Sequence, residues 1–170
     1  MTTRSYEQHN CPIAQALRIV GDQWTLMIVR DALRGVCRFE GFQKSLGLSR
    51  NLLTRRLRQL EEEGLLERRP VDGSRRYEYC PTAKCRDLRV ALLALAEWGE
   101  RWRPDPDGPR LQVRDRNDGE AVGVRFCRLD DGAVIDSGDV EVIRRRAARA
   151  AEPDGERLME HIENSIGSDG

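Results

Sequence analysis

The sequence lacks the features that mark several large classes of protein. Its two histidines, His9 and His161, stand near opposite ends of the chain, so histidine-based acid–base chemistry has few candidates. The five cysteines are an odd number and include no C-x2-C pair, which argues against a disulfide framework and a structural zinc site. No G-x-S-x-G, P-loop, H-E-x-x-H or dinucleotide-binding motif occurs. We therefore expect no enzymatic activity, no metal and no cofactor.

Long apolar runs are missing as well. No run approaches the roughly 18 residues of a membrane span, and the first ten residues contain no apolar stretch of the kind found in signal peptides. Hydrophobic residues make up 39% of the chain and charged residues 34%, which allows a core within a highly charged chain. We expect a cytoplasmic protein without a membrane partner.

The chain also lacks net charge, which at first sight argues against a nucleic-acid partner. The charges are unevenly divided, however. Residues 1–103 hold 19 basic and 13 acidic side chains, whereas residues 104–170 hold 10 basic and 16 acidic ones. A cationic first part joined to an acidic second part favours a polyanionic partner on the first part alone.

Three helices are predicted in the first part of the chain. Residues 12–20 and 39–46 carry apolar groups at helical spacing, and residues 23–34 are apolar on several faces, as in a buried helix. A glycine follows each of them: Gly21, Gly35 and Gly47.

A fourth, arginine-rich helix is predicted to begin after Ser49, a residue type favoured at the N-cap. Its apolar stripe consists of Leu52, Leu53, Leu57 and Leu60. The three glutamates at 61–63 confine its positive charge to the first turns, and Gly64 is a candidate C-cap. Arginine can bind guanine, asparagine can bind adenine, and threonine can contact the thymine methyl group. The candidate DNA-binding residues of this helix are Ser49, Arg50, Asn51, Thr54, Arg55 and Arg58.

A hairpin is predicted next, with strands over residues 65–69 and 76–80 and an Asp-Gly turn signal at Asp72 and Gly73. It adds four candidate DNA-binding residues, Arg68, Arg69, Arg75 and Arg76. The order of elements predicts a winged helix-turn-helix unit, with one helix in the major groove and the hairpin on phosphates or in the minor groove. The alternative is a solvated charged surface. The coincidence of capped turn, glutamate cluster and arginine hairpin favours DNA binding.

A long helix is predicted from Pro81-Thr82 to about Trp102. Its apolar stripe is larger than a three-helix domain needs, which favours a homodimer over the alternative that the stripe only covers its own core. The stripe consists of Leu88, Leu92, Leu95, Trp98 and Trp102.

The remainder of the chain changes character, and in places after residue 110 its apolar residues, several of them valines, alternate with polar ones as in a strand. Residues 104–110 are predicted to be a linker, residues 111–150 a small β-rich appendage, and residues 151–170 a flexible or partly helical tail. Turn signals within the appendage are Asp118-Gly119, Asp131-Gly132 and Ser137-Gly138. The predicted fold class is therefore α+β, with a DNA-binding and dimerisation domain over residues 1–103.

Residues 11–103 resemble the HxlR-type transcriptional regulators, which are similar to MarR-type regulators. The resemblance is carried by the segments CPIAQALRIVGDQWTLMIVRDAL, RFEGFQKSLGLSRNLLTRRLRQLEEEGLLER, RRYEYCPTA and LLALAEWGERW. It implies a homodimer that represses or activates a nearby operon through a two-fold symmetric operator on double-stranded DNA. It also implies a recognition helix over 49–58, a wing over 69–76, and a dimer to which the first helix contributes Ile13 and Leu17. The competing function is a winged-helix adaptor that binds proteins and not DNA.

The regulatory signal has several candidates. Cys11 precedes the first helix, whose N-terminus favours a thiolate, and several regulators that the chain resembles sense oxidants through a cysteine there; the alternative is a small packing residue. Trp24 and Trp98 are candidates to line a pocket for a small-molecule effector, although buried tryptophan is more often core. Cys37, Cys80 and Cys85 are interpreted as small apolar fillers.

The appendage has two interpretations. Some longer family members carry a zinc-ribbon-like tail with two Cys-Gly knuckles, and here Asp118-Gly119 and Asp131-Gly132 stand at the corresponding places. The resemblance therefore implies a β module that kept the turns and lost the metal. The competing interpretation is a dimer arm or a flap that binds an effector.

Overall fold

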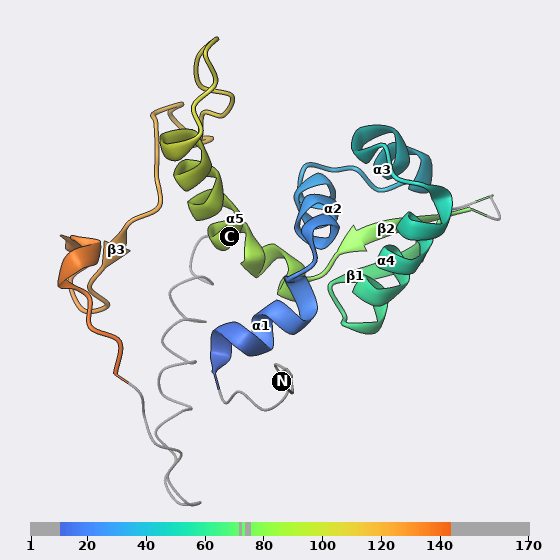
Figure 1. The fold of residues 1–170 in the computed structure, drawn as a ribbon, viewed down its shortest axis with the longest axis horizontal. Coiled ribbons are helices and arrows are strands. Elements are labelled where there is room, and N and C mark those ends of the chain that lie inside the picture. The colour runs from blue at the N-terminus through green and yellow to red at the C-terminus, as the bar shows by residue number, and fades with distance from the viewer. Residues whose placement is uncertain (1–10, 72, 74–75, 144–170) are drawn as a thin grey trace, which may run out of the picture. The chain divides into compact units, whose positions relative to one another are not determined.

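The computed structural model describes residues 11–71, 73 and 76–143. The chain divides into two compact units, Met1–Val124 and Arg125–Gly170, and Figure 1 shows the ribbon. The first unit confirms the predicted α+β winged-helix architecture. Its elements are α1 (Pro12–Val20), α2 (Gln23–Leu33), α3 (Phe39–Leu46), α4 (Arg50–Glu62), β1 (Leu66–Pro70), β2 (Tyr77–Pro81) and α5 (Ala83–Trp102).

The core of this unit forms around α2, which contacts α3, α4, α5 and β2. These surrounding contacts explain why α2 is apolar on several faces. The largest fully buried side chains come from α2, α3, α4 and the start of the hairpin, and they include Ile28, Phe42, Leu53, Leu57, Leu60, Leu65 and Leu66. In Figure 1, α3, α4 and the hairpin lie together at one end of the unit.

Two glycines in the left-handed conformation delimit α4. Gly47 has φ +64° and ends α3 immediately before the tight turn into α4. Gly64 has φ +68° and follows the other end, where Leu65 N donates to Leu60 O at 2.8 Å and Gly64 N donates to Glu61 O at 2.9 Å. This pair of hydrogen bonds is a Schellman motif, which favours glycine because a Cβ atom disfavours positive φ.

The hairpin is antiparallel, with Glu67 opposite Cys80 and Arg69 opposite Glu78. Each strand begins one residue later than predicted. In β1 the reason is that Leu65 completes the end of α4 by its hydrogen bond to Leu60. Tyr79 anchors the hairpin: its ring is buried and makes edge-to-face contact with Phe42, at a centroid distance of 6.3 Å.

The segment after α5 is less regular than predicted. Within the first unit, one bridge between Arg114 and Ala121 replaces the longer strands expected from the alternating pattern. In the second unit, β3 (Phe126–Cys127) pairs with β4 (Val134–Ile135), and a 3-10 turn, η2, spans Ser137–Asp139. Side-chain carboxylates accept hydrogen bonds from nearby turn amides, as between Asp115 and Asn117 N at 2.7 Å, and this favours turns over continued strand pairing.

The predicted turn residues of the appendage do form turns. Gly119 and Gly132 have φ +79° and +71°, and Ser137-Gly138 lies in η2. Residues 111–124 belong to the same compact unit as α5, so the predicted appendage is shared between the two units. Its residues 144–150 and the predicted tail over 151–170 lie outside the described residues. Across the described ranges, no helix combines the length and apolar character needed to cross a membrane.

Candidate nucleic-acid interface

One face of α4 is exposed and polar, and the other belongs to the core. Leu53, Leu57 and Leu60 are buried, and Leu52 packs partly against the same cluster. Ser49 caps the helix, its Oγ accepting from Leu52 N at 3.4 Å. All six candidate DNA-binding residues of the helix are exposed: Ser49, Arg50, Asn51, Thr54, Arg55 and Arg58. The helix therefore presents the donor-rich surface that base-edge recognition requires.

An ion pair that the sequence analysis missed joins α4 to α2. Arg56 points away from the exposed face, and its Nη2 donates to Asp22 Oδ2 at 2.5 Å. The other oxygen of Asp22 accepts from Trp24 N at 3.0 Å and caps α2. Asp22 therefore sets the start of one helix and the position of another. An Asp before a helix is a sequence signal for the cap, but no local signal identifies its partner 34 residues away.

Replacing Asp22 with Ala is expected to lower the free energy of unfolding by about 2–3 kcal/mol, because it removes a helix cap and leaves a half-buried guanidinium unpaired. Denaturant unfolding measures the change. Asp22→Asn should cost less, since the amide oxygen keeps the cap. Arg58→Ala, which breaks the exposed pair with Glu62, should cost at most about 0.5 kcal/mol. A loss for Asp22→Ala no larger than that control would contradict this role.

The predicted wing residues differ in their surroundings. Arg68 lies over the Tyr77 ring, with 4.9 Å between its Cζ and the ring centroid, and it also pairs with Glu61. Arg69 pairs with Glu67 at 2.5 Å. Arg76 is exposed and immediately precedes β2, whereas Arg75 lies outside the described residues.

Some of the candidate DNA-binding arginines form ion pairs with carboxylates, and others do not. Glu61 and Glu62, at the end of α4, pair with Arg68 and Arg58. No carboxylate among the described residues forms an ion pair with Arg50 or Arg55. The uncompensated positive charge of the helix therefore lies in its first two turns.

The protonation states near the hairpin follow from burial. Burial, followed by the side-chain hydrogen bond with Tyr77, raises the pKa of Tyr79, so this phenol is neutral at physiological pH. Burial raises the pKa of Cys85, and burial together with Glu78 raises the pKa of Cys37. These two thiols are therefore poor nucleophiles, in keeping with the packing role predicted for them. Cys80 is half-buried, and Cys11 is half-buried at the start of α1.

The predicted dimer residues separate into two groups. Leu88 and Leu92 pack against the protomer's own core. The others are exposed large apolar side chains on α1 and α5; Ile13 is 70%, Leu95 53%, Trp98 62% and Trp102 64% exposed, and Leu17 is also exposed. Apolar surface of this extent on neighbouring positions of a long helix is typical of an interaction face.

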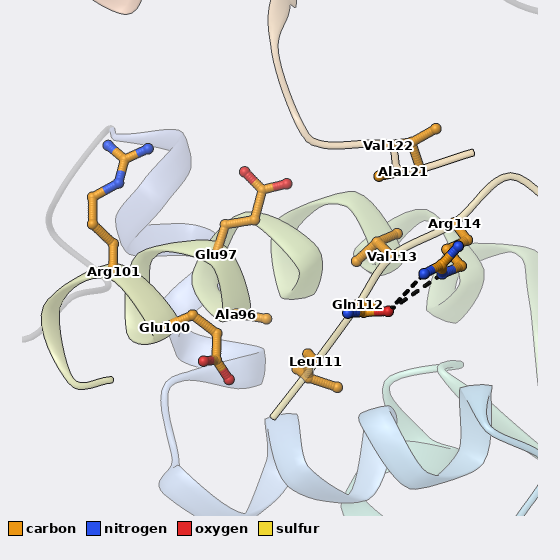
Figure 2. Close-up of a pocket in the computed structure, with 10 residues that line it drawn as sticks. All are labelled: Ala96, Glu97, Glu100, Arg101, Leu111, Gln112, Val113, Arg114, Ala121 and Val122. Atoms are coloured by element: carbon orange, nitrogen blue, oxygen red, sulfur yellow. Dashed lines mark hydrogen bonds between the residues drawn. The ribbon is translucent and has the colours of Figure 1, made fainter. Parts of the chain in front are cut away.

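A cavity that sequence reasoning did not find lies between α5 and the segment 111–122 (Figure 2). Its volume is about 400 Å³. Two carboxylates of α5 hold the ends of this segment: Glu97 accepts from Val124 N at 2.7 Å, and Glu100 accepts from Arg110 N at 3.2 Å. Neither Trp24, which packs against the core, nor Trp98 lines this cavity. The pocket proposed for those two residues stays a prediction.

The fold and the exposed arginine helix define a winged helix-turn-helix protein. The sequence profile of the HxlR-like helix-turn-helix family matches residues 19–107. Rv3095, an uncharacterized HTH-type transcriptional regulator of Mycobacterium tuberculosis, is 38% identical over 129 residues, which are 75% of this chain and 82% of that protein. The chain belongs to the HxlR-like family, as its resemblance indicated, and is a helix-turn-helix transcriptional regulator.

Solved structures agree with this assignment. PA1607, a candidate transcription factor, is 38% identical with a TM-score of 0.74, and the match covers 84% of this chain and 100% of that one. PA1374, a candidate transcription factor from Pseudomonas aeruginosa, is 39% identical with a TM-score of 0.58, covering 88% and 99%. The redox regulator HypR in its oxidized form is 29% identical with a TM-score of 0.51, covering 55% and 98%.

Proposed function

We propose that the protein binds double-stranded DNA in the cytoplasm as a homodimer, on a two-fold symmetric operator. The helix α4 enters the major groove, and the β1–β2 wing lies on the backbone or in the minor groove. The observation that supports this proposal is the difference between the two sides of α4. Leucines occupy its buried side, and the exposed side holds Asn51, Thr54 and two arginines, Arg50 and Arg55, that pair with no carboxylate in the part of the chain that the structure describes.

The test is to sequence the DNA fragments that the purified protein retains from its own genome, and then to measure affinity for the enriched site at several salt concentrations. A regulator should enrich discrete sites and show log K falling steeply with log salt, because phosphate contacts release counterions. If no fragment is enriched, the result contradicts the proposal and favours the competing function, an adaptor that binds other proteins.

The homodimer is supported by the exposed apolar side chains of α1 and α5. Two recognition helices must reach successive major grooves about 34–36 Å apart, which a two-fold dimer can arrange. Repression and activation use the same contacts to DNA, so the proposal covers both.

Thiol oxidation at Cys11 is the first candidate signal. It is supported by the place of Cys11 at the N-terminus of α1, where Gln15 N donates to its carbonyl at 3.0 Å, and by the likeness to a redox regulator. A small-molecule effector is the other candidate, for which the cavity beside α5 offers a volume in the range of ligand sites.

Diamide is expected to abolish operator binding by the wild type and to leave Cys11→Ser unaffected. Electrophoretic shifts with and without the oxidant measure this effect. Cys127→Ser is the matched control, since Cys127 is the exposed cysteine of the second unit, and it should respond to diamide as the wild type does. Full binding by the oxidised wild type would disprove the thiol signal.

A further inference from the structure

A groove separates the start of the recognition helix from the wing. Its volume is about 840 Å³, and the elements around it, α3, α4 and the hairpin, lie at the same end of the first unit (Figure 1). Arginines and aromatic residues both contribute to its lining, which includes Arg38, Arg50, Arg76, Phe39, Tyr77 and Tyr79. A concave surface with several cations suits a DNA phosphate.

The cations of the groove differ in how far they are neutralised. Arg38 Nε donates to Glu78 Oε1 at 3.0 Å, which compensates its charge. Glu40 also lines the groove and adds one negative charge. Arg50 has no carboxylate partner among the described residues, and its Cζ lies 5.2 Å from the centroid of the Phe39 ring. Arg50 is therefore held by a ring face, which leaves its N–H groups available to an anion.

This arrangement separates Arg50 from the other exposed residues of α4. Arg50 lines the groove, whereas Asn51 and Arg55 do not. The ring that holds the guanidinium belongs to Phe39 of α3, which also lines the groove, so the contact between the two side chains lies at the groove. An exposed arginine loses rotamer freedom when it binds a phosphate, and a guanidinium already placed over a ring has lost part of that freedom before binding.

We infer that Phe39 is a positioning residue of the DNA interface: its ring holds the Arg50 guanidinium at the groove, where Arg50 binds a backbone phosphate. The inference rests on the proposed function and refines it, since the sequence had grouped Arg50 with residues that read bases. Arg50 then sets the register of the protein on DNA, and Asn51 and Arg55 are left to distinguish sequences.

A double-mutant cycle on the full chain tests the inference, with affinity for the enriched operator measured over a range of salt. Arg50→Ala should weaken binding to all sequences alike and reduce the slope of log K against log salt by about one. Phe39→Leu should weaken binding about 2- to 5-fold in the wild-type background and have no further effect in Arg50→Ala. Phe39→Tyr, which keeps the ring, should bind within about twofold of the wild type.

Arg55→Ala provides the matched background, because Arg55 is also exposed but does not line the groove. In that background Phe39→Leu should cost the same 2- to 5-fold as in the wild type. Phe39 also packs against the core, and Phe39→Leu could therefore prevent folding. In that case Phe39→Met replaces it in the same cycle, because methionine is closer to phenylalanine in volume than leucine is. The inference would be overturned if Phe39→Leu lowered operator affinity equally with and without Arg50. It would also be overturned if Arg50→Ala altered the base preference and left the salt slope unchanged. A wild type that enriches no DNA would overturn the proposed function itself, whereas binding without this coupling overturns the positioning role alone.

Discussion

Arg55→Ala is expected to weaken operator binding by roughly 10- to 100-fold and to relax preference at one base pair of each half-site, because a bidentate arginine–guanine contact supplies about 1–3 kcal/mol of discrimination. Arg55 lies on the exposed face of α4, and no described carboxylate pairs with it. Its guanidinium can therefore reach a base edge without first breaking an ion pair. Affinities for the operator and for single-base variants of it measure the effect.

Arg58→Ala is the matched control for that experiment. It removes the same charge from the same exposed face one turn further along the helix, but Arg58 Nε already donates to Glu62 Oε1 at 2.8 Å. The control should lose less affinity and keep the base preference. If Arg58→Ala relaxed the preference and Arg55→Ala did not, the recognition surface would lie nearer the C-terminal half of α4.

Trp98→Glu is expected to convert the proposed dimer to monomers and to lower operator affinity by about 100- to 10,000-fold, because linked half-sites lose their avidity when the protomers separate. Trp98 is 62% exposed on α5, and two-fold symmetry would bury two new carboxylates for each substitution. Light scattering after size-exclusion chromatography measures the oligomeric state, and the shift assay measures the affinity.

Leu129→Glu is the matched control for the dimer. Leu129 is an apolar side chain of similar exposure, 74%, but it lies in the second unit. It should leave both the dimer and the affinity unchanged. The opposite pattern, with dissociation by Leu129→Glu and not by Trp98→Glu, would assign dimerisation to the C-terminal region, which was the competing interpretation of the appendage.

The helices of the first unit were predictable from the spacing of their apolar residues, and two of them also carry a local signal at both ends. Ser49 before α4 and Gly64 after it marked that helix to within two residues, and Pro12 and Gly21 did the same for α1. The region after residue 110 was less predictable. Its alternating valines indicated strands, but the carboxylates of its turns bind backbone amides and the segment is held to α5 through Glu97 and Glu100.

The residues that form the candidate site were predictable from the sequence, but the contacts that each of them makes were less so. Helical spacing alone placed Arg50, Asn51 and Arg55 opposite the buried leucines. The stripe on α5 was treated as one surface, yet Leu88 and Leu92 complete the protomer's own core and Trp98 and Trp102 stay exposed. Periodicity identifies the side of a helix, but it cannot tell how far along the helix the neighbouring elements extend.

The sequence by itself determined which side of α4 faces solvent, because a period of 3.6 residues places Leu53, Leu57 and Leu60 on one side whatever surrounds the helix. Tertiary structure alone decided which arginines keep their charge available. Arg68 is compensated by Glu61, whereas Arg50 lies over the Phe39 ring. Coulombic and ring contacts depend on distance in space, and the chain segments that make them are brought together only when the hairpin and α3 pack beside α4.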